Sequence, residues 1–463
     1  MCGIYLGEEE DFKIINMVAS RGKDLQKSVK FNKFFLFSSV LAIRDKIEQP
    51  IITENFSFLY NGEIYNETVS DTIFIKETIE DVLLHFKHDQ HKIQEISMDI
   101  YTKINKFENE LALVILFKDY ILFFKDDIGR KSLGYKLNKL QISSVGYQNE
   151  VDCLFLYIYD IKEKSLQKVL KQSDYVQHLV SNYHRIAHMI QQNKSYAFLN
   201  QENFKKSESL INKNCSVHDL DKLLFESTKM RLIKGNIVVL FSGGIDSNII
   251  VLYLILASKS DQKIFLINSS FIDSQDRENA KTSYSLFKKT FPERIIELVI
   301  VDLNCEMIKT YKQHLEDLIY PKTSKMDLNI AAVLYFGARE ARNYSKVCYL
   351  GSGADEIFCG YNKYKGDEYR DKMFFDLFTI SYHNTTRDDR CISDNNIEPR
   401  FPFLDTKIIK SSFLIKSEEI KNKAILRKIL ENYGLGELSS FKKVAMQYGS
   451  GIYKIEKHLY KKN

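Results

Sequence analysis

The strongest constraint on the fold is a series of four short, almost entirely apolar runs in the second half of the chain. The runs are NIVVLF (236–241), KIFLINSSF (263–271), IIELVIVDL (295–303) and KVCYLG (346–351), and a helix-length segment separates each from the next. Continuous apolar strands that alternate with helices are typical of a parallel sheet covered by helices on both faces. Ligands of such sheets bind beyond the carboxyl ends of the strands, so we expect a site there.

The first apolar run leads directly into the sequence SGGIDS. The pattern predicts a strand that ends at Phe241, a tight turn over 242–244 and a helix that begins near Asp246. Two glycines allow the backbone to approach an anion closely, and the free N–H groups of the first helical turn are donors for phosphate oxygens. The hydroxyl groups of Ser242 and Ser247 can add further donors. The loop is not a Walker A loop, because GxxxxGK[ST] is absent.

The first half of the chain has a different texture. Aromatic and β-branched residues dominate the short runs KFFLFSSVLAI (33–43), FSFLYNGEIY (56–65), LALVILFKDYILFFK (111–125) and KLQISSVGY (139–147), and polar residues or glycine separate them. DTIFIKETIEDVLLHF (71–86) has apolar residues at helical spacing. We therefore expect stacked, largely antiparallel sheets with a few helices.

Composition narrows the class of protein. The 463 residues favour two domains, and the net charge of +5 is spread along the chain, which gives no indication of nucleic-acid binding. No apolar run reaches the length of a bilayer span, and the acidic GEEED near the start is unlike a signal peptide. Seven cysteines without a CxxC pair favour reduced thiols, so we expect a cytoplasmic protein without a membrane partner.

The second half resembles asparagine synthetase, and its SGGIDS resembles the pyrophosphate loop of N-type ATP pyrophosphatases. The other matching motifs, in family order, are LGSGADEIFCGY (350–361), TRDDR (386–390), IEPRFPFLD (397–405), KAILR (423–427) and KKVAMQYGSG (442–451). The resemblance implies that the chain binds ATP and Mg²⁺. Residues implied to contact ATP or pyrophosphate are Ser242, Gly243, Gly244, Asp246, Ser247, Gly353 and Arg390. Residues implied to hold Mg²⁺ are Asp246, Asp355 and Glu356. The late motif implies that Lys443 faces the reacting phosphates; Lys442 is the alternative, since the register is not fixed.

The first half resembles the class II glutamine amidotransferases. MCGI at the start, YNGEIYN (60–66), SDT (70–72) and FFKDDIGRKSLGY (123–135) carry this resemblance. Removal of Met1 would expose an α-amino group with a pKa near 8 beside the Cys2 thiol, where it can act as a local base. The resemblance implies that Cys2 is the nucleophile and that Asn61 and the Gly62 N–H stabilise the oxyanion. It implies that Asp71 binds the α-ammonium group of glutamine.

Two positions depart from the family pattern. Val40 stands where asparagine synthetases have the arginine that holds the glutamine carboxylate, and Ser352 stands where they have a glutamate. Arg44 follows Val40 on the same face of an extended strand but roughly 13 Å away, so we expect it to replace that arginine directly only if a bulge breaks the strand. Loss of an ion-paired contact to a carboxylate commonly costs a few kcal/mol. Activity could therefore be weakened or directed to another substrate.

Together these observations predict an Ntn-type amidotransferase-like domain over 2–185, a connector over 186–215 and an α/β ATP pyrophosphatase-like domain over 216–463. The resemblance is to the asparagine synthetase family and, within it, to the subgroup of asparagine synthetase domain-containing proteins. It implies an enzyme that uses glutamine, ATP and an acceptor, with aspartate as the expected acceptor and asparagine as product. Two alternatives stay open: an amide ligase with another acceptor, and a regulatory or binding protein without catalysis. The oligomeric state also stays open, with a homodimer as one option.

Overall fold

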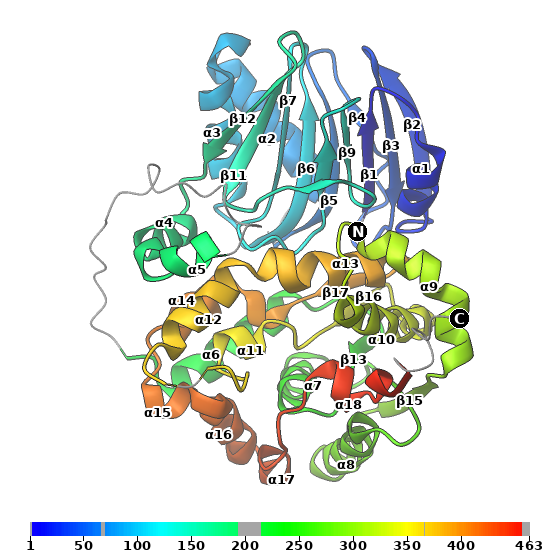
Figure 1. Cartoon of the computed structure of the whole chain (residues 1–463), viewed down its shortest axis with the longest axis vertical. Helices are drawn as coiled ribbons and strands as arrows, with labels where there is room; N and C mark the ends of the chain where they lie inside the picture. The colour runs from blue at the N-terminus through cyan, green and yellow to red at the C-terminus, as the bar shows by residue number, and fades with distance from the viewer. Residues whose placement is uncertain (1, 66–69, 193–213, 365, 456–463) are drawn as a thin grey trace.

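The structure is a computed structural model that describes residues 2–65, 70–192, 214–364 and 366–455. In Figure 1 the N-terminal sheets, in blue and cyan, lie above the C-terminal half, and helix α13 (Thr386–Ser393) and strand β17 (Glu398–Arg400) lie at the boundary between them. The two halves have different sheet types, as the two sequence textures predict.

Two six-stranded antiparallel sheets form the N-terminal half, which confirms the expected stacked arrangement. The first sheet has the order β10-β8-β9-β1-β3-β2. Its strands are β1 (Cys2–Gly7), β2 (Leu25–Phe31), β3 (Phe34–Val40), β8 (Gly134–Lys136), β9 (Gln141–Ser143) and β10 (Asn149–Glu150). The second sheet has the order β12-β11-β7-β6-β5-β4. Its strands are β4 (Ile51–Ile52), β5 (Ser57–Ile64), β6 (Asn109–Leu116), β7 (Tyr120–Lys125), β11 (Phe155–Asp160) and β12 (Ser165–Leu170).

Helices cover the outer face of each sheet. Helix α1 (Phe12–Ala19) contacts β1 and β3, while α2 (Asp71–His85) and α3 (Ile93–Ile104) pack together beside the second sheet. The expected helix over 71–86 is thus confirmed as α2. Apolar side chains of α2, α3 and the second sheet form one buried cluster, separate from the larger core that runs from the space between the sheets into the C-terminal half.

The C-terminal half is a five-stranded parallel sheet with the order β15-β14-β13-β16-β17. Its strands are β13 (Ile237–Leu240), β14 (Ile264–Ser270), β15 (Ile296–Asp302), β16 (Val347–Tyr349) and β17. The first three strands proceed in one direction from β13, and the last two proceed in the other. The topology therefore reverses between β13 and β16, which is where open α/β sheets bind ligands.

Helices surround this sheet and extend away from it. They are α6 (Val217–Met230), α7 (Ile245–Ala257), α8 (Gln275–Thr290), α9 (Cys305–Ile319), α10 (Lys325–Ala341), α11 (Ala354–Ile357), α12 (Tyr369–Phe378), α13, α14 (Thr406–Ser412), α15 (Ser417–Ile420), α16 (Ala424–Asn432), α17 (Gly436–Ser439) and α18 (Met446–Gly449). Helix α7 is apolar on all sides because it is buried by β13, α6, α16 and α17. No helix in the described ranges is both long and apolar enough to cross a membrane.

The segment after the second sheet packs against the C-terminal half. Helices α4 (Asp174–Ser181) and α5 (Ala187–Gln192) follow β12. The His178 ring contacts Phe413, and Arg185 donates to Asp371 over 2.7 Å. Most of the predicted connector, residues 193–213, lies outside the described residues.

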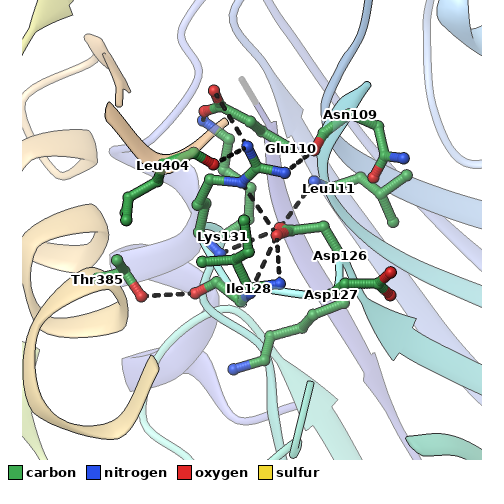
Figure 2. A network of polar contacts seen from close by, with 12 residues as sticks. Asn109, Glu110, Leu111, Asp126, Asp127, Ile128, Lys131, Thr385 and Leu404 are labelled. Atoms are coloured by element: carbon green, nitrogen blue, oxygen red, sulfur yellow. Dashed lines mark hydrogen bonds and ion pairs between the residues drawn. The ribbon is translucent and has the colours of Figure 1, made fainter. Parts of the chain in front are cut away.

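A buried layer of charged side chains joins the two halves. The Arg231 guanidinium of the C-terminal half pairs with Glu110 (2.8 Å) and Glu108 (2.9 Å) of the N-terminal half and with Asp405 (3.0 Å). Figure 2 shows the neighbouring part of this layer around Asp126 and Lys131, which Leu404 and Thr385 approach from the C-terminal half. Paired charges of this kind fix the relative orientation of the two halves, since each has its partner in only one arrangement.

We predict that Arg231→Met destabilises the protein by about 3–5 kcal/mol, because it removes the nearest cation from the buried carboxylates of Glu110 and Asp405 and one of the two arginines that pair with Glu108. Urea unfolding followed by fluorescence measures the change. The control is Lys222→Met, which removes an exposed lysine from a helical ion pair with Glu226 and should change the unfolding free energy by less than about 0.5 kcal/mol. Equal effects of the two substitutions would contradict the structural role of the buried layer.

Candidate functional site

A cavity of about 780 Å³ opens at the carboxyl ends of β13 and β16. Its lining includes four predicted site residues. Ser242, Asp246 and Ser247 come from the turn after β13 and the start of α7, and Gly353 comes from the loop after β16. The same lining includes Asp355 and Glu356, which follow Gly353 in the short helix α11. It also includes Lys443, which lies far along the chain near the C-terminus. The parallel sheet brings the loops after β13 and β16 together because these strands are neighbours and end at the same edge, whereas Lys443 comes from the segment between α17 and α18.

The loop at the start of α7 has the geometry of an anion site. Gly243 has a φ of +74°, and a Cβ there would lie 2.3 Å from the backbone nitrogen of Ala280 in α8. Glycine is thus required both by the left-handed conformation and by the close approach of α8. Ser242 accepts a hydrogen bond from the Gly244 N–H over 3.2 Å. The 13-residue helix α7 then directs its free N–H groups and its positive dipole end toward the cavity.

Two carboxylates and two lysines meet at the mouth of this loop. Lys423 donates to both oxygens of Asp246 over 2.6 Å and lies 2.5 Å from Asp355. Lys443 lies 2.5 Å from the other oxygen of Asp355 and 3.8 Å from Asp246. Burial by itself raises the pKa of Asp355, but the two ammonium groups lower that pKa to about 2. Asp355 is therefore ionised at neutral pH, and both aspartates are paired with lysine.

Asp246 and Asp355 fit a magnesium ion that is shared with phosphates. In the described parts of the chain, no group of three or more His, Cys, Asp or Glu side chains could hold a metal ion by itself. Mg²⁺ is usually held by one or two carboxylates together with waters and substrate phosphates, so two carboxylates suffice. Glu356 has other partners: Tyr361 (2.9 Å) and Asn384 (2.7 Å) both donate to its Oε1, and burial raises its pKa to about 7.

Sequence reasoning missed several residues of this site. Lys423 begins the KAILR motif, and no local sequence pattern indicates its contacts with Asp246 and Asp355, which are distant in the sequence. Asn384 comes from a π-helical turn over Ser381–Thr385, for which the sequence has no clear signal. Asp276 lines the cavity from α8, and burial raises its pKa to about 7.

Arg390 does not lie at the cavity, and its assignment to ATP or pyrophosphate is corrected here. Its guanidinium is fully buried and donates to the carbonyls of Leu318 (2.7 Å) and Ile319 (3.0 Å), and it stacks on the Tyr147 ring of the N-terminal half. The neighbouring residue Arg387 lines the cavity instead. The two arginines are three residues apart on α13, but their long side chains reach different partners: Arg387 donates to Asp327 over 2.8 Å, whereas Arg390 reaches the carbonyls at the end of α9.

Ser352 lines the cavity beside Asp388. Its hydroxyl donates to Asp388 over 3.4 Å, and Asp388 is also bound by Arg387 over 2.7 Å. The serine leaves room where the family pattern has a longer, charged side chain. The cavity wall therefore has a polar but uncharged group at this position.

Cys2 and Asn61 come together between the two N-terminal sheets. The Cys2 nitrogen donates to Asn61 Oδ1 over 2.8 Å, and Gln49 Nε2 lies 3.6 Å from the Cys2 sulfur. The Asn61 Nδ2 group is buried and has no acceptor among the described residues. Such an unpaired donor suits an oxyanion that is present only during a reaction. Gly62 follows on β5 with a φ of +147°, and a Cβ there would lie 2.0 Å from the Glu110 carbonyl oxygen.

Arg44 lies beside Asp71, in a segment that has left the strand. β3 ends at Val40, and residues 41–44 leave the strand and bend, so the extended-chain distance does not apply. Arg44 lies 3.0 Å from Asp71 and 2.9 Å from Glu63. Burial and Glu63 raise the pKa of Asp71 to about 8, although Arg44 opposes this shift. The Arg44 guanidinium and the side-chain carboxyl groups of Glu63 and Asp71 therefore lie close together.

Comparisons with known proteins cover both halves of the chain. The family model described as asparagine synthase matches residues 219–374 and 366–459. An asparagine synthetase domain-containing protein of Saccharomyces cerevisiae is 30% identical, with 96% of this chain and 89% of that protein covered. A protein of the same description from Drosophila melanogaster is 24% identical over 98% of both chains. A putative glutamine-hydrolyzing asparagine synthetase of Methanocaldococcus jannaschii is 24% identical over 88% of this chain and 81% of that protein.

The pKa of Asp276 makes the stability of the cavity wall dependent on pH. A folded-state pKa of about 7, above the usual 3.8, means that the folded protein binds the proton more tightly, so stability is lost as pH rises through 7. We predict that Asp276→Asn becomes progressively more stable than the unchanged protein between pH 5 and pH 8, by about 2–4 kcal/mol at the upper end. Urea unfolding at several pH values measures this, with the exposed Asp273→Asn as control. A difference that does not change with pH would contradict the prediction.

Proposed function

This chain belongs to the asparagine synthase family, and on that premise we propose that it is a glutamine-dependent, ATP-consuming amide ligase. The observation that carries the proposal is the pair Asp246 and Asp355, held between two lysines at the anion-binding start of α7. The cavity next to this pair is large enough for a nucleotide and a small acceptor. We propose aspartate as the first acceptor to test and asparagine as its product.

In this proposal the C-terminal cavity binds ATP with its phosphates at the α7 loop. The N–H groups after Ser242 bind the phosphate oxygens, and Asp246 and Asp355 would hold Mg²⁺, which supplies neutralisation of the phosphate charge. Lys423 and Lys443 then exchange part of their carboxylate contacts for contacts with pyrophosphate. An acceptor carboxylate oxygen attacks the α-phosphorus, the bond to pyrophosphate breaks, and the acyl-adenylate forms. Ammonia attacks the acyl carbon, AMP leaves with the oxygen, and a proton is lost from the nitrogen.

The N-terminal half would supply the ammonia. Once Met1 is removed, the Cys2 nitrogen that contacts Asn61 becomes an α-amine, and it takes the thiol proton. The sulfur attacks the side-chain amide carbon of glutamine, and the oxyanion that forms receives hydrogen bonds from Asn61 Nδ2 and the Gly62 N–H. The C–N bond breaks and the proton leaves with ammonia. Water then hydrolyses the thioester to glutamate and free Cys2. Burial raises the pKa of the Cys2 thiol, so the adjacent base is needed for its activation.

A second candidate acceptor class is favoured by Ser352. The uncharged hydroxyl in the cavity wall suits an acceptor that lacks the positive group a glutamate would bind. The adenylation chemistry is unchanged in this case, and only the partner of the acceptor head group differs.

We predict pyrophosphate release when the chain is given Mg·ATP, aspartate and either glutamine or ammonia. A coupled pyrophosphate assay across amino-acid and simple dicarboxylic acceptors tests this. Release with succinate or malate but not with aspartate would favour the second acceptor class. Absence of pyrophosphate with every acceptor, together with thermal stabilisation by ATP, would contradict the ligase and indicate a binding protein.

We predict that Cys2→Ala lowers glutamine-dependent amide formation by at least about 1,000-fold and leaves ammonia-dependent formation within about twofold, because the nucleophile serves only the N-terminal half. Product analysis with each nitrogen source measures both activities. The matched control is Cys153→Ala, a buried cysteine outside both sites, which should leave the ratio of the two activities unchanged. Glutamine-dependent turnover that survives in Cys2→Ala would refute the assignment.

A further inference from the structure

One face of β5 carries two polar side chains, Asn61 and Glu63, whose spacing suits the length of an amino acid. Asn61 and Glu63 are two residues apart, so their side chains lie on the same face of the strand, roughly 6–7 Å apart. Asn61 binds the nitrogen of Cys2, whereas Glu63 binds Arg44. The amide end of a bound glutamine belongs at Asn61, and its head group, two methylene groups further on, then falls near Arg44 and Asp71.

The pair Arg44 and Asp71 is complementary to a zwitterionic head group. Their charged groups are 3.0 Å apart, and the Arg44 side chain is 40% exposed. An α-amino acid carries an ammonium and a carboxylate on one carbon, so it can insert between the two. Each partner then exchanges one ion pair for another, and no charge is left buried without a partner.

Glu63 keeps Arg44 in position during such an exchange. Arg44 Nε lies 2.9 Å from Glu63 Oε1, while its NH1 group lies 3.0 Å from Asp71. The other Glu63 oxygen is held by Arg400 over 2.8 Å, and Arg400 is buried. The Nε contact can therefore persist while the terminal nitrogens of the guanidinium bind another carboxylate, as its forked geometry allows.

We propose that Arg44 binds the α-carboxylate of glutamine by exchanging its ion pair with Asp71 for one with the substrate. The inference rests on the proposed glutaminase site and assigns a specificity role to Arg44, which lies in the bend after β3. Asp71 receives the α-ammonium group in the same step. Before glutamine binds, Arg44 and Asp71 contact each other, and bound glutamine replaces that contact with two, one from Arg44 to its carboxylate and one from Asp71 to its ammonium group.

The test measures binding to the full chain carrying Cys2→Ala, so that no turnover occurs. Isothermal titration calorimetry compares three ligands: glutamine, glutaramate, which lacks the ammonium group, and 4-aminobutanamide, which lacks the carboxylate. Arg44→Ala should weaken glutamine and glutaramate by about 10- to 100-fold, the usual loss for a charge-assisted contact. It should leave 4-aminobutanamide unchanged or tighter, because Arg44 no longer competes for Asp71. Arg44→Lys, which keeps the charge without the fork, should weaken glutamine less than Arg44→Ala.

Asp71→Asn should give the reciprocal pattern: it should weaken the binding of glutamine and 4-aminobutanamide but not the binding of glutaramate. Lys46→Ala removes an exposed positive charge from the same loop and should change none of the three affinities. Equal weakening of all three ligands by Arg44→Ala, or no weakening of glutamine, overturns the role of Arg44 and leaves the glutaminase proposal standing. Failure of the Cys2→Ala protein to bind glutamine at all overturns the glutaminase site and this inference together.

Discussion

The buried ionic layer between the two halves is the interaction on which the arrangement of both sites depends. Arg130, Arg231 and Arg400 are almost completely buried, and each has carboxylate partners within 3.1 Å. Charges removed from water in this way are tolerated only with partners of good geometry, so the layer strongly disfavours any other docking of the halves. Because the docking of the two halves is fixed, the position of Cys2 relative to the cavity is fixed as well.

Arg400 connects this layer to both sites directly. Its guanidinium binds Glu63, the residue that also holds Arg44, and its carbonyl accepts a hydrogen bond from Leu350 over 3.1 Å. Leu350 lines the cavity and begins the loop that carries Asp355. A second connection runs through the π-helical turn, where Ser381 donates to Glu150 and Thr385 donates to the Gly129 carbonyl. Asn384 of the same turn binds Glu356 on the cavity side.

Much of the fold was predictable from local pattern. The apolar run before Ser242 and its glycine turn specify a buried strand followed by a helix, because few other conformations satisfy an all-apolar strand and an adjacent left-handed glycine. The aromatic runs of the first half likewise specify sheets. Prediction failed where an element ended or turned. The end of β3 at Val40 placed Arg44 near Asp71, and tertiary partners drew the two arginines of α13 apart, Arg390 to the Leu318 carbonyl and Arg387 to the cavity.

The sequence by itself determined the two sheet types, the anion-binding loop and the identity of the groups that carry charge toward it. These follow from periodicity and backbone preference, which act over a few residues. Only the tertiary structure decided which charges meet. Lys423 lies between Asp246 and Asp355, although 177 residues separate Lys423 from Asp246, and Arg44 lies beside Asp71 across a bend. Electrostatic pairing depends on distance in space and on burial, and neither is encoded in local spacing.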